Sequence, residues 1–157
     1  MPRKMAKAGN CDIVAARLKI NAALELRVLA QRFEGLCHVH IREFALTNDN
    51  VFVATPKGVN IPVEKLDLAL DAVRELRDAG DNEGVVATIP AGNGRAIQFA
   101  ITKWQGTTKA DLRLHFTKGG TEELLPTRKG VRLNLALLPE LERALEALDR
   151  ELFEERS

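Results

Sequence analysis

The sequence predicts an α+β protein made of two repeats, in each of which four antiparallel β-strands precede one helix. Apolar and polar residues alternate along much of the chain, and a period of two places every second side chain on the same face of a strand. Leucines at helical spacing follow each set of alternations. The pattern of the first half then recurs in the second half.

The alternation is clearest in residues 95–135, which contain the only Trp and eight of the 23 Lys and Arg residues. Ile97, Phe99 and Ile101 share one face of the expected strand, so Trp104 falls on the opposite, polar face. The later strands add to that polar face Lys109, Asp111, Arg113, His115 and Arg132. Cations beside an exposed ring suit single-stranded nucleic acid, because cations follow the phosphates and a flat ring stacks on a base. A Trp that only covers the rim of a small core is the alternative.

The repeat is visible when residues 24–76 are aligned with residues 95–148, with a single-residue gap in the loop after the second strand. The aligned pairs include Phe33 with Trp104, Gly35 with Gly106, Arg42 with Arg113, Lys57 with Lys129, Gly58 with Gly130 and Leu66 with Leu138. An aromatic residue, two glycines, an Arg, a Lys and a helix recur in one order, which indicates an internal duplication.

The alignment divides the chain into a basic arm (1–19), a first repeat (20–80), a linker (81–94) and a second repeat (95–157). Strands are expected in the first repeat at 24–33, 37–44, 51–54 and 59–63, and in the second at 96–104, 108–116, 121–126 and 130–135. Pro56-Lys57-Gly58 and 47–50 are expected turns. One helix presents Leu66, Leu70, Val73 and Leu76 and ends at Ala79-Gly80; the other starts near Pro139 and presents Leu141, Leu145, Leu148 and Leu152.

The arm and the linker are expected to contain little regular structure. The arm is either a disordered tail, with a short helix over 12–18 as an option, or a segment that adds sequence-independent contacts to phosphates. Within the linker, 85–89 could form a short extended piece, and Gly92-Asn93-Gly94 is expected to be a turn because it lacks the Lys-Ser/Thr of a phosphate-binding loop.

The net charge of +1 hides a strong asymmetry along the chain. Residues 1–19 have five basic residues against one acidic residue, and residues 95–135 have eight against three, whereas residues 24–63 have four of each sign. The local field therefore decides which partners bind, and the second repeat is the more cationic half.

The two cysteines, Cys11 and Cys37, do not form the pattern of a disulfide framework. Without a signal peptide after the basic N-terminal residues, two thiols favour a reducing, cytoplasmic setting, associated with the nucleoid in a bacterium or nuclear in a eukaryote. No apolar run approaches the ~20 residues that a membrane helix needs, so no membrane association is expected.

Metal, cofactor and enzyme chemistry are not predicted. His38 and His40 share one strand face, but Cys37 points to the other face and no second cluster of ligands completes a metal site. No nucleophile, general base or paired carboxylates occur in a catalytic arrangement. The expected protein is non-enzymatic and has no cofactor.

The first repeat contains the motifs FEGLCHVHIREF and TPKGVNI, and the second contains WQGTTKADLRLHF and TRKGVRL, each group followed by an amphipathic helix. In this order the motifs resemble the positive cofactor four family of transcriptional coactivators. The resemblance covers about two thirds of the chain. It implies a curved four-stranded sheet with one helix, two copies of which pair to bind the two arms of an opened DNA duplex. Here both copies lie in one chain, which implies an intramolecular pseudo-dimer and a monomeric protein; the Whirly proteins have a similar layout, but their lysine-rich motif is not found.

The resemblance also implies which residues contact DNA. In the second repeat the matching positions are Arg95, Trp104, Arg113, Phe116, Arg128 and Lys129, and Lys109 joins them from the basic face. In the first repeat the family positions are kept by Phe33, Arg42 and Lys57. Leu24, Leu36, His40 and Ala45 depart from the pattern, as does Thr107 in the second repeat. The first repeat is therefore expected to bind weakly and to complete the pseudo-dimer.

The predicted function is binding of single-stranded DNA with little sequence preference, in transcriptional regulation, repair or recombination. The expected partners are single-stranded DNA, melted duplex or RNA, and the transcription machinery. A duplicated protein–protein interaction scaffold that has lost nucleic-acid binding is the alternative, since the first sheet is neutral and the helices are acidic.

Overall fold

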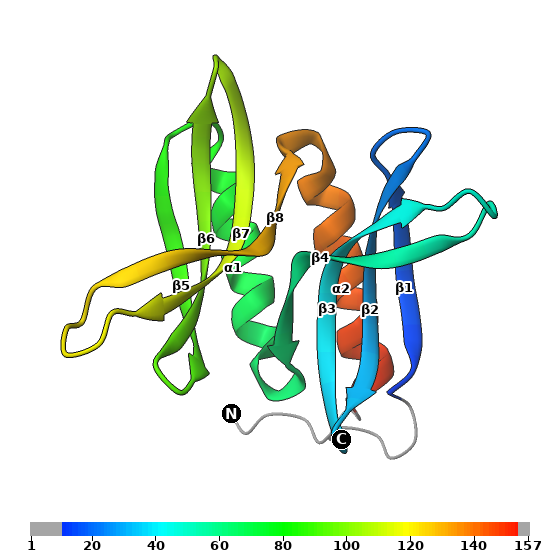
Figure 1. The fold of residues 1–157 in the computed structure, drawn as a ribbon, viewed down its shortest axis with the longest axis horizontal. Helices are drawn as coiled ribbons and strands as arrows, with labels where there is room; N and C mark the ends of the chain where they lie inside the picture. The colour runs from blue at the N-terminus through cyan, green and yellow to red at the C-terminus, as the bar shows by residue number, and fades with distance from the viewer. Residues whose placement is uncertain (1–10, 154–157) are drawn as a thin grey trace.

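The structure, a computed structural model, describes residues 11–153, which form two four-stranded antiparallel sheets and two helices (Figure 1). The first half contains β1 (Ile13–Lys19), β2 (Leu24–Phe33), β3 (Leu36–Leu46), β4 (Phe52–Pro62) and α1 (Leu66–Ala79). The second half contains β5 (Gly84–Gly92), β6 (Arg95–Trp104), β7 (Thr107–Thr117), β8 (Leu124–Asn134) and α2 (Leu138–Leu152). Neighbouring strands in each sheet are consecutive in the chain. The predicted α+β fold with two ββββα repeats is confirmed.

The duplication is visible in the register of the strands. Leu24 lies opposite Ala45 in the first sheet, and Arg95 lies opposite Phe116 at the equivalent place in the second. The tight hairpins at Glu34-Gly35 and Gln105-Gly106 both have positive φ at the two central residues, as a type I′ turn requires. The two repeats therefore share the geometry of their turns as well as the order of their elements.

Two strands decide the predictions for the arm and the linker: β1 contradicts the optional helix over 12–18, and β5 confirms and lengthens the extended piece at 85–89. Residues 13–19 form β1 and residues 84–92 form β5, each at the edge of its sheet; Gly92-Asn93-Gly94 makes the turn of the β5–β6 hairpin. A register shift between Val14 and Ala16, and another between Val85 and Ala87, interrupts each strand. Such a bulge breaks the period of two, which is why the alternation revealed neither β1 nor the full length of β5. Residues 1–10 of the expected arm lie outside the described residues.

Two pairs of expected strands are in fact single strands. The pieces expected at 51–54 and 59–63 form the continuous β4, and those at 121–126 and 130–135 form the continuous β8. Pro56-Lys57-Gly58 lies within β4 beside a register shift, so it is a bulge in a strand and not a turn between strands. Each sheet still has the expected four strands. Two expected pieces merge into one strand in each sheet, and β1 or β5 is added at its edge.

Each helix packs mainly against the sheet of the other repeat. Helix α1 lies against β5 and β6, and α2 lies against β1 and β2, while β4 and β8 meet between the sheets (Figure 1). The buried residues of both sheets and both helices form one core cluster. Neither repeat covers the apolar face of its sheet with its own helix, so the two repeats form one folding unit.

Ion pairs reinforce the contact between the two helices. The buried Glu142 of α2 accepts hydrogen bonds from Arg74 Nε of α1, at 2.9 Å from its Oε2, and from Arg77 Nη1. Arg74 Nη2 also donates to Glu146 Oε2 at 3.1 Å. These bonds compensate the burial of the Glu142 carboxylate. Among the described residues, neither helix has the length and hydrophobicity needed to span a membrane.

Cys11 and Cys37 form a disulfide, so the prediction of two free thiols is wrong. Their Cα atoms are 5.9 Å apart, although 26 positions separate them in sequence. The bond joins the residues just before β1 to the start of β3. The expectation of a reducing compartment rested on free thiols and no longer has that support. The sulfur of Cys37 is covalently bonded to that of Cys11.

Reduction of this disulfide should lower the free energy of unfolding by about 3.5 kcal/mol, because the bond closes a loop of 26 residues in the unfolded chain. Urea unfolding with and without a dithiol reductant measures the difference. The Cys11→Ser/Cys37→Ser double variant serves as the control and should respond to urea identically in both conditions. An unchanged midpoint for the reduced wild-type protein would contradict the prediction.

Candidate nucleic-acid interface

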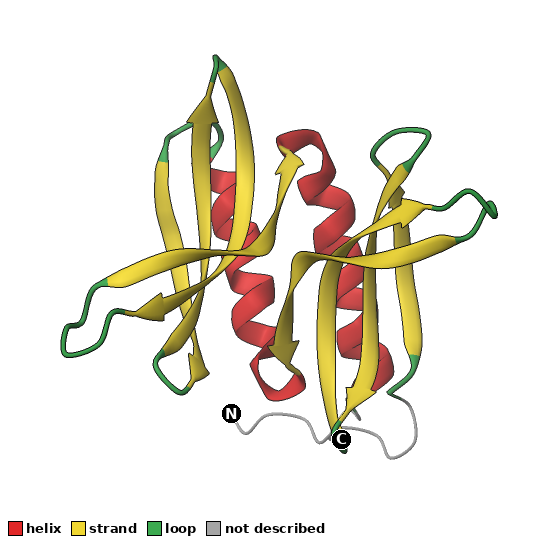
Figure 2. Cartoon of the chain, in the orientation of Figure 1, coloured by secondary structure: helices red, strands yellow, loops and turns green. Residues whose placement is uncertain are grey.

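The helices cover one face of each sheet and leave the opposite face open (Figure 2). In β6, Ile97, Phe99 and Ile101 are buried on the helix side. On the other side of the same strand Gln98 is half-buried and Trp104 is 65% exposed. The predicted division into an apolar face and a polar face is therefore confirmed, and the high exposure of Trp104 argues against a ring that covers the rim of a core.

Trp104 stands beside a small cavity at the end of the polar face. The cavity has a volume of about 150 Å³ and is lined by Thr102, Trp104, Thr107, Lys109 and Arg132. An exposed indole next to two cationic side chains can stack on a base while the cations approach its phosphates. Arg132 was placed on the polar face by its alternation with Val131 and Leu133, but it was missed as a site residue.

A buried carboxylate organises the arginines of this face. Asp111 accepts hydrogen bonds from Arg113 Nε at 3.0 Å and from Arg132 Nε at 2.9 Å. The side chain of Arg113 is only 18% exposed, whereas that of Arg132 is 51% exposed. Arg113 is thus held in the sheet, and Arg132 remains available to a ligand.

Arg113 also stabilises a bulge in β8 that contains the predicted basic pair, Arg128 and Lys129. Register pairs place residues 127–129 opposite the single residue Leu114. Thr127 Oγ1 donates to the Leu114 carbonyl at 2.8 Å, and Arg113 Nη1 donates to the Thr127 carbonyl at 2.9 Å. Arg128 and Lys129 are exposed on the bulge that these bonds pin in place.

The same bulge recurs in β4 of the first repeat. Thr55 Oγ1 donates to the Glu43 carbonyl at 2.9 Å, and Arg42 Nη1 donates to the Thr55 carbonyl at 2.9 Å. Lys57 is exposed on this bulge. Arg42 Nη2 donates to Asn60 Oδ1 at 2.6 Å, and burial lowers the pKa of the Arg42 guanidinium. Arg42 and Arg113, both predicted to contact DNA, therefore position the bulges that carry the exposed cations.

Close packing of these arginines explains the glycine that follows each bulge. A Cβ added to Gly58 would lie 2.8 Å from the Arg42 Cα, and one added to Gly130 would lie 2.7 Å from the Leu112 carbonyl oxygen and 2.9 Å from the Arg113 Cα. These distances are too short for any side chain at either glycine unless the backbone moves. In the Lys-Gly pair of each repeat, the glycine is thus required for packing and the lysine supplies the charge.

The seam between the sheets brings cations of both repeats together. A cavity of about 210 Å³ is lined by Glu43 and Lys57 from the first repeat and by Arg113 and Arg132 from the second. No sequence pattern could reveal this neighbourhood, because it depends on how β4 and β8 meet. The seam therefore gathers three cationic side chains and one carboxylate from both repeats around a single cavity.

Arg95 and Phe116 form a separate pair at the far end of β6 and β7. They are partners in the strand register, nine positions along β6 from Trp104, or roughly 30 Å at the usual rise of a strand. Phe116 is 42% exposed. By alternation both residues share the face of Ile97 and not the face of Trp104. The structure therefore does not bring them to the Trp104 cavity, and the side chain of Phe33 lies outside the described part of the chain.

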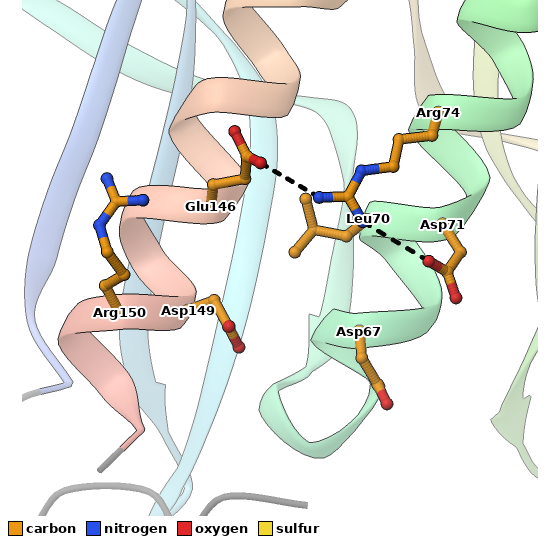
Figure 3. A pocket seen from close by; sticks show the side chains of 7 residues that line it. All are labelled: Asp67, Leu70, Asp71, Arg74, Glu146, Asp149 and Arg150. Atoms are coloured by element: carbon orange, nitrogen blue, oxygen red, sulfur yellow. Dashed lines mark hydrogen bonds and ion pairs between the residues drawn. The ribbon is translucent and has the colours of Figure 1, made fainter. Parts of the chain in front are cut away.

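The opposite side of the molecule has an acidic groove between the helices (Figure 3). It has a volume of about 310 Å³, and its lining includes the carboxylates of Asp67, Asp71, Glu146 and Asp149 beside Arg74 and Arg150. Four carboxylates against two guanidiniums disfavour a polyanion. This charge distribution makes the helix side a less favourable surface for a polyanion than the cationic sheet faces.

Replacement of Gly130 by Ala should destabilise the protein by about 2 kcal/mol, because the new methyl group would overlap the backbone of β7. The free energy of unfolding from urea titration measures the effect. Gly119→Ala is the matched control, since a Cβ at Gly119 meets nothing within 4 Å, and it should change stability by less than about 0.5 kcal/mol. Equal stability of the two variants would show that the close approach to Arg113 is not required.

Comparisons with known proteins agree with the motifs. Residues 92–144, which run from the end of β5 into α2, match the protein family described as Transcriptional Coactivator p15 (PC4). Two crystal forms of BPSL1147, described as a PC4 homolog from Burkholderia pseudomallei K96243, are also similar. The tetragonal form has 20% sequence identity and a TM-score of 0.40 and covers 44% of this chain and 100% of that chain; the orthorhombic form has 22% identity and a TM-score of 0.38 and covers 43% and 92%. No curated protein matches the chain.

Proposed function

We propose that this chain, whose second repeat is similar to the PC4 family, binds single-stranded DNA on the polar faces of its sheets and catalyses no reaction. The observation that carries the proposal is the 65% exposed Trp104 beside a cavity that Lys109 and Arg132 also line. An aromatic ring contributes about 1–3 kcal/mol for each base that it stacks. The adjacent cations supply the attraction to phosphates.

The pinned bulges extend this surface along the strand of DNA. Arg128 and Lys129 are exposed on one bulge and Lys57 on the other, and the seam cavity joins Lys57 to the arginines of the second repeat. Phosphates and the faces of bases are common to all sequences, so the preference for any one sequence should be weak.

The arrangement of the repeats supports a role at opened duplex. Two sheets within one chain can each hold one stretch of single strand, and the chain acts as a monomer in this proposal. Transcriptional regulation, repair and recombination all expose such strands, in the nucleoid or the nucleus, and the transcription machinery is the expected protein partner. RNA is distinguished from DNA by competition between oligomers of equal length and sequence.

Titration with oligothymidine tests the proposal directly, because Trp104 is the only tryptophan and a stacked base should quench its emission. Trp104→Ala should weaken binding about 10- to 100-fold, which follows from losing one stacked base at ~1.4 kcal/mol per factor of ten. Anisotropy of a labelled oligomer measures both proteins, and Trp104→Phe, which keeps a ring, should lose less. Unchanged Trp104 emission at saturating DNA would contradict the proposal.

Salt dependence tests the role of the bulge in β8. Each phosphate contact to a single strand contributes about 0.7 to the slope of log affinity against log salt, so Arg128→Ala/Lys129→Ala should flatten the slope by about 1.4. Lys57→Ala removes one cation from the first repeat and should flatten it by about 0.7 at most. An affinity of the wild-type protein that stays constant from low to moderate salt would be incompatible with this surface.

A further inference from the structure

The polar face of the first sheet carries a cluster of arginine and phenylalanine side chains that the family resemblance does not supply. The Arg27 guanidinium carbon lies 4.3 Å from the centre of the Phe44 ring and 5.9 Å from that of Phe52. The Arg17 guanidinium carbon lies 5.8 Å from the centre of Phe52. The four side chains come from all four strands, so they form a connected arginine–aromatic surface across the sheet.

A buried glutamate orients this cluster. Glu25 accepts a hydrogen bond from Arg17 Nε at 2.8 Å and one from Arg27 Nε at 2.5 Å. The hydrogen bond from Arg17 is the main cause that lowers the pKa of the Glu25 carboxyl, which burial alone would raise. The carboxylate offsets one of the two positive charges and fixes the guanidinium groups against the rings. The cluster therefore offers ordered flat surfaces with little net charge.

A cavity of about 310 Å³ lies next to the cluster. Phe44 and Leu29 supply apolar walls, and Gln31, His40, Arg42 and Asn60 supply polar groups. This volume is at the lower end of the range for small-molecule sites. A flat ring with hydrogen-bonding edges suits such a lining, which combines apolar side chains for contact with its faces and amides for contact with its edges.

At the equivalent place in the second repeat, charged side chains stand where the first repeat has neutral ones. His40 holds the register position of Asp111, and Asn60 holds that of Arg132. Burial, with smaller contributions from Arg42 and His38, lowers the pKa of His40 to about 4, so its ring is neutral at pH 7. The buried Nε2 of His40 has no hydrogen-bond partner among the described residues. Buried polar atoms are nearly always hydrogen-bonded, so this nitrogen, in a residue that lines the cavity, calls for a partner such as an ordered water or a ligand.

From this arrangement we infer that the first repeat has a nucleobase subsite of its own, in which a base of the bound single strand enters the cavity and packs against Phe44 and Leu29. The amides of Gln31 and Asn60 face the edge of the base. The inference rests on the proposed function and changes the role of the first repeat from a weak copy to a half with a base-binding site of its own, in addition to the Trp104 site of the second repeat.

The cavity favours a base over a free anion because Arg42, the arginine in its lining, and the neighbouring Arg27 are both already engaged. Arg42 donates to the Thr55 carbonyl and to Asn60, and Arg27 is paired with Glu25. A phosphate would find few free donors, whereas a base needs apolar contact and neutral partners for its edge. Binding at this subsite should therefore depend only slightly on salt.

Phe44→Ala tests the subsite in the full chain. We expect about a ten-fold loss of affinity for an oligothymidine of ~20 nucleotides, as for one lost stacking partner, with an unchanged salt slope. Quenching of Trp104, which reports the second repeat, should remain complete at saturation. On an oligomer of equal length whose residues lack bases, Phe44→Ala and the wild-type protein should bind equally.

Gln31→Ala serves as the second variant in case Phe44→Ala perturbs the fold, and Val53→Ala, an exposed position on β4, is the matched control. Gln31→Ala should lose about three-fold with thymidine and nothing with the abasic oligomer, and Val53→Ala should lose nothing with either. Wild-type quenching of Trp104 together with full affinity in both subsite variants would overturn the subsite alone. Absence of quenching and of binding in the wild-type protein would overturn the proposed function as well.

Discussion

The exchange of helices between the repeats is the contact on which the rest of the structure depends. Because α1 covers the second sheet and α2 covers the first, each apolar face is buried only when both repeats fold together. The exchange also draws β4 and β8 against each other and leaves both polar faces open on the side away from the helices (Figure 2). The two repeats pack together because each supplies the helix that covers the sheet of the other.

The duplication preserved a backbone device and altered the charges around it. In both repeats a threonine hydroxyl and an arginine pin a bulge, and a glycine lets the arginine pack against the strand. Around that device the second repeat keeps the Asp111 network with Arg113 and Arg132, whereas the first has neutral His40 and Asn60. One scaffold can therefore hold two surfaces of different charge, since the bulge geometry does not depend on the neighbouring charges.

Residues carried over from a family pattern take different roles once the chain is folded. Trp104, Arg128 and Lys129 are exposed, as a ligand contact requires. Arg42 and Arg113 donate their hydrogen bonds to carbonyls and neighbouring side chains, so they position other residues. Arg132 and the Arg27–Phe44 stack had no counterpart in the pattern, although alternation alone indicated that Arg132 lies on the polar face.

The sequence by itself determined both helices, the two-faced strands and the exposure of Trp104, because each follows from a periodicity of two or of 3.6 residues. The duplication follows from the recurrence of these patterns in the second half of the chain. Only the tertiary structure decided four other features. β1 and β5 are interrupted by bulges that erase the period, and the Cys11–Cys37 bond joins positions 26 residues apart. The exchange of helices and the seam that places Lys57 beside Arg132 depend on which apolar face meets which, a choice that long-range packing makes and local periodicity does not encode.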